Sequence, residues 1–327
     1  MGRALTSNLS ISIIIPTFQR PDGLLVAARS IFNQTMLEKT KCTLIIVDND
    51  PKASARDSIE ILRAEAPDNL QFKADYEPAA GVANARNCAI NMVESDLIAF
   101  LDDDQSARDA NWLEKLYKLH MELKPAVVFG PLITALPDDI TRHRKYFSRF
   151  FGRADPSPRG FIKHFHGGCN TLIDVSRLPT KRPLFDPATN ELGGEDDLLF
   201  MDIKAIGGTF AWEPDAGVFE HVQRKRLSLK YTLKRASVYG QGPTSQARRE
   251  RNYPKLLFWM AVGSIKFAYH GTLGAIGYIF NSESSAQHID FAVRGLSKVL
   301  FWKTFALYGN SALVETPSDE PAPADTN

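Results

Sequence analysis

The chain has 327 residues, of which 44% are hydrophobic and 24% are charged, and its formal net charge is +1. These proportions are typical of a folded soluble protein, and the length is enough to bury a sizeable core in one large α/β domain or two smaller ones. The near-zero net charge gives the molecule as a whole no electrostatic preference for nucleic acid.

Three cysteines, Cys42, Cys88 and Cys169, lie far apart and form no CxxC pair. This spacing favours separately packed, small apolar side chains over a disulfide framework or a metal site, and it suits a reducing compartment. Residues 1–10 carry one arginine and lack the apolar core of a signal peptide. We therefore expect the protein to remain in the cytoplasm.

The first part of the chain alternates strand-like and helix-like segments. Residues 11–15, Ile-Ser-Ile-Ile-Ile, stop at Pro16 and predict a strand that is buried on both faces. Further strands are expected at residues 42–47, 70–74, 97–101 and 127–130, and helices at 22–32 (with Asp22 as N-cap), 53–66, 83–94 and 110–123. This alternation predicts an α/β domain with a mostly parallel sheet that helices cover on both faces, so that ligands bind beyond the carboxyl ends of the strands.

The pattern weakens over residues 136–165, where proline, basic and aromatic residues mix without a clear period. We expect a long loop or lid there, with a short helix at about 142–150. Regular structure resumes near residue 167 and continues to about 222. The last segment, 316–327, is rich in proline and aspartate and is expected to be disordered.

An acidic triplet, Asp102-Asp103-Asp104, directly follows the apolar segment 97–101. Three adjacent carboxylates repel one another, and a hard divalent cation relieves that repulsion. Such a cation can hold a diphosphate and neutralise the charge that grows on it as a leaving group. Taken alone, the triplet is equally compatible with a solvated acidic turn that caps the next helix.

A second acidic stretch, Glu195-Asp196-Asp197, follows two glycines and leads into an apolar helical run. The helix dipole favours acidic residues in a first helical turn, so helix capping explains them without any function. Alternatively, one of these carboxylates acts as a general base. The residues alone leave both interpretations open.

Five short blocks, in this order along the chain, resemble the family 2 glycosyltransferases, which have the GT-A fold. The blocks are Ile-Ile-Ile-Pro-Thr-Phe-Gln-Arg at 13–20, Val-Asp-Asn-Asp at 47–50, Gly-Val-Ala-Asn-Ala-Arg-Asn at 81–87, Phe-Leu-Asp-Asp-Asp at 100–104, which matches the DxD metal motif, and the acidic pair 195–196. The resemblance extends from residue 13 to about 221, and the order and spacing of the blocks make it specific.

The resemblance implies a Rossmann-like GT-A catalytic domain over residues 1–222. Its nucleotide-sugar half would cover about 11–130 and its acceptor half about 131–222. A basic and apolar helical region would follow at 223–315, and then the tail at 316–327.

The resemblance also implies roles for individual residues in donor binding. Asp48 would accept hydrogen bonds from the base or ribose, Arg86 would approach the diphosphate, and Asp102 would lie near the ribose. Asp103 ranks lower, because alternation along an extended strand directs it to the opposite side. The implied nucleotide-sugar contacts are Pro16, Thr17, Arg20, Asp48, Arg86, Asp102 and Asp103. Without such a ligand, Asp48 would close its turn and Arg86 would form a structural ion pair.

The resemblance implies a smaller set of residues for metal binding and catalysis. Asp104 would ligate Mg²⁺ or Mn²⁺, with Asp102 beside it, and His221 would reach the metal or diphosphate unless it is an ordinary surface histidine. Asp196 would be the catalytic base, with Glu195 nearby on the acceptor side. A single in-line displacement would invert the anomeric configuration, so a UDP-sugar would give a β-linkage.

The chain differs from the processive, cellulose-type synthases of this family at their Gln-x-x-Arg-Trp motif. The corresponding segment here is Gln-Arg-Lys-Arg-Leu at 223–227, with Leu227 in place of the tryptophan. Because this aromatic platform is missing, we expect transfer of one sugar at a time.

Residues 224–255 contain ten lysines or arginines and one acid, Glu250, a local net charge of +9 (10 − 1). Apolar runs follow at 256–265 and 273–280, interrupted by Lys266 and His270. This pattern favours a helix lying in the surface of the anionic cytoplasmic leaflet over a membrane span. Two ordinary helices packed on the catalytic domain remain the alternative.

Attachment of the protein to a membrane surface would suit an acceptor that is a lipid-linked oligosaccharide. Residues 226–235 resemble bacterial exopolysaccharide glucosyltransferases of the succinoglycan type, which implies glucose transfer from UDP-glucose. Galactose, GlcNAc, GalNAc or rhamnose donors for lipopolysaccharide or capsule are the alternatives within the family.

Three other function classes fit the sequence less well. A sugar nucleotidyltransferase would need a glycine-rich loop after the first strand, which residues 16–23 lack. A non-catalytic carbohydrate-binding module is disfavoured by the two intact acidic motifs. A nucleic-acid-binding protein would need aromatic residues interleaved with the basic ones, and no such pattern occurs.

Overall fold

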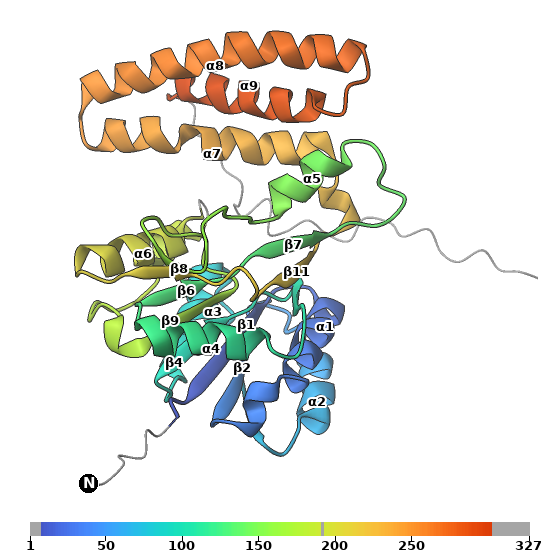
Figure 1. Ribbon diagram of the computed structural model, residues 1–327, viewed down its shortest axis with the longest axis vertical. Coiled ribbons are helices and arrows are strands. Elements are labelled where there is room, and N and C mark those ends of the chain that lie inside the picture. Colours follow the sequence, from blue (N-terminus) through green and yellow to red (C-terminus); the bar gives the residue numbers. More distant parts are fainter. Residues whose placement is uncertain (1–7, 191–192, 303–327) are drawn as a thin grey trace, which may run out of the picture.

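The computed structural model describes residues 8–190 and 193–302 (Figure 1). An α/β unit built around a central sheet forms one part of the molecule, and a layer of long helices lies across it (Figure 1). The tail predicted at 316–327 lies outside the described residues, and so does most of the N-terminal segment.

The first half of the chain supplies most of the central sheet and its covering helices. The elements are β1 (Ile11–Thr17), α1 (Pro21–Phe32), β2 (Cys42–Asp48), α2 (Arg56–Glu65), β3 (Leu70–Tyr76), α3 (Val82–Asn91), β4 (Leu97–Phe100), β5 (Gln105–Ala107), α4 (Trp112–Leu123) and β6 (Val127–Phe129).

The second half adds shorter strands and the long helices. The elements are β7 (Leu132–Ala135), α5 (Arg144–Phe151), β8 (Gly160–Ile162), β9 (Thr171–Asp174), α6 (Glu195–Ala205), β10 (Phe210–Trp212), β11 (Val218–His221), α7 (Leu229–Arg249), α8 (Tyr253–Ile279) and α9 (Ser285–Val299). Short 3₁₀ helices occur at Thr35–Glu38, Val175–Arg177, Pro187–Thr189 and Arg224–Arg226.

The central sheet has the order β3-β2-β1-β4-β9-β6-β10-β8. Its first four strands are parallel, whereas β9 runs antiparallel between β4 and β6. Ile13 and Ile15 of β1 join one apolar core, and Ile14 joins the core on the other face. The prediction of a mostly parallel sheet buried on both faces is therefore confirmed, and the isoleucine run follows from that double burial.

Two helix starts differ from the prediction. Helix α1 begins at Pro21 after Arg20 as N-cap, so Asp22 lies in the first turn and is not the N-cap. Proline at the first helical position explains the shift, because its fixed φ suits a helix start and its missing N–H is not needed there. Helix α2 begins at Arg56, later than predicted, since Ala53 has a left-handed φ of 51°.

A second, three-stranded sheet with the order β5-β11-β7 was not predicted. Strand β5 follows the acidic triplet directly and pairs antiparallel with β11, placing Gln105 opposite Glu220. The backbone N–H of His221 donates to the backbone carbonyl of Asp104 at 2.7 Å. This small sheet therefore holds a distant histidine beside the acidic triplet.

The helical region expected from residue 223 onward consists of α7, α8 and α9 (Figure 1). Helix α8 continues without a break through Lys266 and His270. It packs closely on α9 because Gly263 and Gly295 face each other: a Cβ on Gly263 would lie 2.6 Å from the Gly295 carbonyl oxygen. In the described part of the chain, no helix combines the length and the apolar character that crossing a membrane requires.

Helix α5 connects this layer to the α/β unit. Its aromatic residues form a third apolar cluster with residues of α9 and of the segment that follows β11. The hydroxyl of Tyr146 in α5 donates to Asp290 of α9 at 3.1 Å, and both side chains are buried. The short helix expected at 142–150 is thus present and has a docking role.

Candidate active site

The predicted donor residues gather at the carboxyl ends of β1, β2 and β4. In the parallel ladder Thr17 lies opposite Asp48, and the β4 residue Phe100 lies opposite Ile14. The chain beyond Phe100 therefore delivers the acidic triplet to the edge where β1 ends. This is the edge at which open α/β sheets bind ligands.

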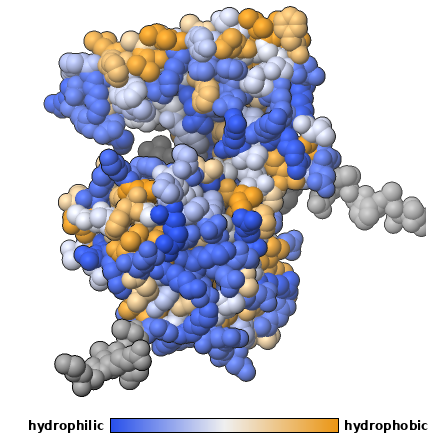
Figure 2. Space-filling model, viewed as in Figure 1, coloured by the Kyte–Doolittle hydropathy of each residue, from blue (hydrophilic) through white to orange (hydrophobic). Residues whose placement is uncertain are grey.

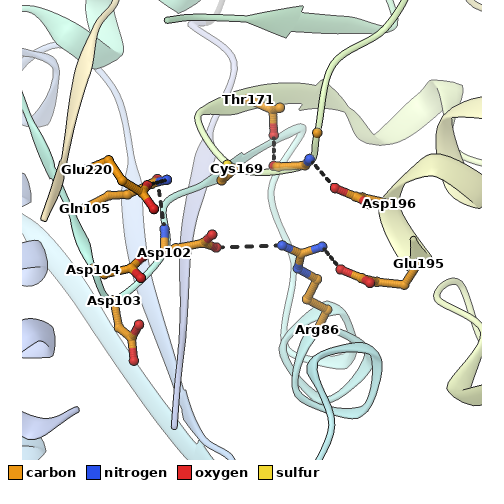
Figure 3. Close-up of polar contacts among 12 residues, drawn as sticks. Arg86, Asp102, Asp103, Asp104, Gln105, Cys169, Thr171, Glu195, Asp196 and Glu220 are labelled. Carbon is orange, nitrogen blue, oxygen red and sulfur yellow. Dashed lines mark hydrogen bonds and ion pairs between the residues drawn. The ribbon is translucent and has the colours of Figure 1, made fainter. Parts of the chain in front are cut away.

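Asp103 stabilises the loop between β1 and α1. Its carboxylate accepts hydrogen bonds from the Thr17 hydroxyl at 2.8 Å and the Phe18 N–H at 3.2 Å, and it pairs with Arg20 at 2.6 Å. The side chain is 5% exposed and points away from Arg86 (Figure 3). Asp103 is not separated from Asp104 as strand alternation predicts, because the chain turns at these two residues beyond β4, and both carboxylates contact Nη1 of Arg20. In this structure, the Thr17 hydroxyl is also committed to that internal contact.

Asp48 closes the turn that follows β2. Its two carboxylate oxygens accept from the backbone N–H groups of Asp50 at 3.0 Å and Ala55 at 2.8 Å. The residue is 3% exposed. The turn-closing role that the sequence analysis gave as the alternative is therefore present, and contact with a base or ribose stays a prediction.

Arg86 lies between Asp102 and Glu195 (Figure 3). This buried residue of α3 pairs with Glu195 at 2.6 Å and with Asp102 at 3.7 Å. Its guanidinium also lies 5.5 Å from the centre of the Phe100 ring. Asp102 and Glu195 are 93 positions apart in sequence (195 − 102). Only the fold therefore brings both carboxylates to the guanidinium of Arg86.

Asp196 lies beside this bridge at the start of α6. Its Oδ2 accepts from the backbone N–H of Gly168 at 2.5 Å, and its Oδ1 accepts from the N–H of Asp197 at 2.9 Å. Side-chain atoms of Asp196 lie so near Gly168 that a Cβ there would be 2.9 Å from the Asp196 Cβ. Gly168 therefore keeps the space in which this carboxylate is held.

Asp104 faces two arginines. Arg20 contacts its Oδ2 at 2.9 Å, and Arg226 contacts the same oxygen at 3.3 Å. The backbone of His221 is hydrogen-bonded to that of Asp104. Its side chain, however, shares a hydrogen bond of 2.8 Å with the Ser106 hydroxyl. Contact between the His221 ring and a metal thus stays a prediction.

The carboxylates at this edge destabilise one another's charged forms. Desolvation raises the pKa of Asp102 to about 6 against the opposing effect of Arg86, and Asp104 and Asp103 raise it further. Desolvation also raises the pKa of Glu220 to about 8, with Asp104 as the next contribution. Oxygen donors crowded in this way suit Mg²⁺ or Mn²⁺, so the side chains of Asp102 and Asp104 fit a hard divalent cation.

Three residues at the site were not among the predicted contacts. Arg226 reaches Asp104 from the segment after β11, and the Gln-x-x-Arg pattern at 223–226 was the available signal for it. Glu220 lies beside the triplet through the β5–β11 pairing. Arg153 donates to the carbonyl oxygens of Gly130 at 2.8 Å and Gly167 at 2.7 Å, and nothing in its sequence context indicated this.

Comparison with known proteins supports the resemblance seen in the sequence. The succinoglycan biosynthesis protein ExoM of Rhizobium meliloti (strain 1021) is 31% identical over 290 residues, which cover 88% of this chain and 90% of ExoM. Among solved structures, the mannosyltransferase PcManGT from Pyrobaculum calidifontis, in complex with GDP-Man and Mn²⁺, matches with a TM-score of 0.58 and 16% identity, covering 91% of this chain and 89% of that one.

A further structural match is S. aureus TarS 1-349 in complex with UDP-GlcNAc, with a TM-score of 0.52 and 11% identity, covering 89% of this chain and 90% of that one. At these identities the two solved structures establish the shared GT-A fold. The family model described as glycosyl transferase family 2 matches residues 12–178, which include the acidic triplet and Arg86. Together with the identity to ExoM, this match shows that the chain belongs to glycosyl transferase family 2.

Proposed function

We propose that the protein is a metal-dependent, inverting glycosyltransferase that adds one sugar at a time to a glycan or lipid-linked oligosaccharide during exopolysaccharide biosynthesis. The observation that carries this proposal is the bridge from Asp102 through Arg86 to Glu195, next to Asp196. Through Arg86 it joins Asp102, our proposed donor-side carboxylate, to Glu195, the sequence neighbour of our proposed base. This arrangement suits a reaction in which the donor and the acceptor must meet at a fixed distance.

On the donor side, Asp104 and Asp102 would hold Mg²⁺ or Mn²⁺. When bound, such a cation stabilises the charge on a departing nucleoside diphosphate. Arg20 and Arg226 add positive charge at the same place, because both already contact Asp104. Pro16, the Thr17 backbone and the Asp48 turn would border the nucleotide.

On the acceptor side, Asp196 would accept the proton of the attacking hydroxyl. Its carboxylate is oriented by the Gly168 N–H, and Arg86 neutralises the neighbouring Glu195. Attack from the face opposite the leaving group inverts the anomeric configuration, so a UDP-sugar with an α-linked sugar yields a β-linkage.

The donor we favour is UDP-glucose, since ExoM is named for succinoglycan biosynthesis and residues 226–235 resemble glucosyltransferases of that type. The two solved relatives are in complex with GDP-Man and with UDP-GlcNAc. Nucleotide sugars that carry mannose, galactose, GlcNAc, GalNAc or rhamnose are therefore the donors to compare with it.

A donor screen tests the proposed reaction. The full-length protein is incubated with UDP-, GDP- and dTDP-sugars and Mn²⁺, and nucleotide release is measured. We expect release from one donor class, its loss in EDTA, and a decrease of at least about 100-fold in Asp104→Ala, because the metal supplies several kcal/mol of charge stabilisation. Asp57→Ala, on the exposed side of α2, is the control. Activity that survives both EDTA and Asp104→Ala would exclude the metal-dependent mechanism.

The membrane surface is the proposed location, on the inner face of the cell membrane. Helix α8 exposes an uncharged apolar stripe that includes Leu257, Phe258, Ile265, Tyr269, Ile276 and Ile279, each at least 49% exposed. Figure 2 shows apolar residues along this outer edge of the helical layer. Residues 224–255 lead into this helix with a local net charge of +9. Apart from Arg226, which contacts Asp104, their basic side chains would attract anionic lipids at about 1 kcal/mol each near the surface.

Vesicle binding tests this location. The protein is expected to sediment with vesicles that contain phosphatidylglycerol, less strongly at high salt, and not to bind an oligonucleotide of equal charge density. The double variant Leu257→Glu, Ile265→Glu should lose most of this binding, whereas Ile61→Glu, at an exposed apolar position of α2, should retain it. Equal binding by the two variants would contradict a docking role for α8.

A further inference from the structure

The segment between α5 and β9 brings together an aspartate and two histidines. His164 and His166 form a His-x-His sequence just after β8, and both rings direct Nε2 at the same oxygen, Oδ2 of Asp155. The two distances are 2.6 and 2.8 Å, and the candidate ligand atoms of the three residues all lie within 4.8 Å of one another. Three potential metal ligands therefore converge on one point.

The surrounding structure holds two of these side chains in place. Asp155 is 3% exposed in its side chain, and its other oxygen accepts the backbone N–H of Ser157 at 2.7 Å. The His166 ring packs between the rings of Phe129, at 5.5 Å, and Trp212, at 5.0 Å between centroids. Since the side chain of His164 is 57% exposed, the cluster is open to solvent on that side.

The donor set differs from that of the acidic triplet. Two imidazole nitrogens with one carboxylate oxygen are typical of Zn²⁺ sites that keep an open coordination position, whereas oxygen-only sites suit Mg²⁺ and Mn²⁺. We propose that Asp155, His164 and His166 form a second cation site, selective for Zn²⁺ and separate from the Asp102–Asp104 site.

The position of this cluster indicates its role. His166 directly precedes Gly167, which accepts from Arg153, and Gly168, which donates to Asp196. A metal joining Asp155 to His166 would close the loop whose end orients the carboxylate of Asp196. The site would thus fix the acceptor-side loop, and none of its three ligands would need to touch the substrate.

The test uses tag-free, full-length protein that has been stripped of metal by a chelator and dialysed. Zn²⁺ binding is measured by calorimetry and metal content, and Co²⁺ is added as a spectroscopic probe for nitrogen ligands. We expect a single equivalent of Zn²⁺ and a visible Co²⁺ absorption band in the wild type. His166→Ala and Asp155→Asn should each weaken Zn²⁺ binding by at least about 100-fold, since even loss of an outer-shell partner costs 10–100-fold.

Two controls separate this site from its alternatives. His270→Ala in α8 removes a histidine elsewhere, and Asp104→Asn alters the donor-side site; both should keep full Zn²⁺ binding and the Co²⁺ band. Circular dichroism establishes that each variant is folded. Absence of Zn²⁺ binding in the wild type, or equal binding in His166→Ala, would overturn the proposal and leave a hydrogen-bonded triad. The measurement does not depend on sugar transfer, so it is independent of the donor screen.

Discussion

The variant Asp196→Asn is expected to lower kcat by about 10²–10⁴-fold and to leave the Kd for the nucleotide sugar nearly unchanged. General-base catalysis contributes a factor of this size, and an amide cannot accept the proton of the attacking hydroxyl. The amide oxygen can still accept the Gly168 N–H, whereas the amide NH2 cannot accept the Asp197 N–H, so circular dichroism should accompany the kinetics. Single-turnover transfer and donor binding by calorimetry measure the two quantities.

Asp197→Asn is the matched control, because it makes the same chemical change one position along α6 at an exposed residue. It should retain most of the activity. Equal loss of kcat in the two variants would point to a general electrostatic effect of the α6 N-terminus. Normal turnover in Asp196→Asn would remove Asp196 from the role of base.

Arg86→Met is expected to lower the free energy of unfolding by about 3–5 kcal/mol, because it leaves Glu195 buried without its cation and deprives Asp102 of a counter-charge. Methionine replaces much of the arginine's volume, so the loss reports mainly on charge, including the attraction between the guanidinium and the Phe100 ring. Urea denaturation measures the change.

The double variant Arg86→Met, Glu195→Gln should recover part of the lost stability, since a neutral amide costs less to bury unpaired than a carboxylate. Activity should stay low in both variants, because the bridge between donor side and acceptor side is missing. If Arg86→Met were as stable as the wild type, the bridge would not stabilise the fold.

The parallel half of the sheet could be predicted because its signals are local. The run Ile13-Ile14-Ile15 stops at a proline, and a strand buried on both faces needs such a continuous apolar run. The candidate site was predictable for a related reason, since Asp102–Asp104 and Glu195–Asp196 stand where regular elements end or begin. Strand β5, with the sequence Gln-Ser-Ala, was missed because it lacks the continuous apolar run that marked the equally short strands β4 and β6.

The sequence by itself determined the α/β class, the order of the motifs and the residue types available for metal binding and proton transfer. Only the tertiary structure decided which of them meet: Arg86 with Asp102 and Glu195, Arg226 with Asp104, and Asp155 with its two histidines. The contacts of Arg86 with Glu195 and of Arg226 with Asp104 join residues 109 and 122 positions apart, so they depend on strand order and crossover connections, which a short polar segment does not encode. Asp155 lies only 9 and 11 positions before its histidines, and the conformation of one loop segment brings these three together.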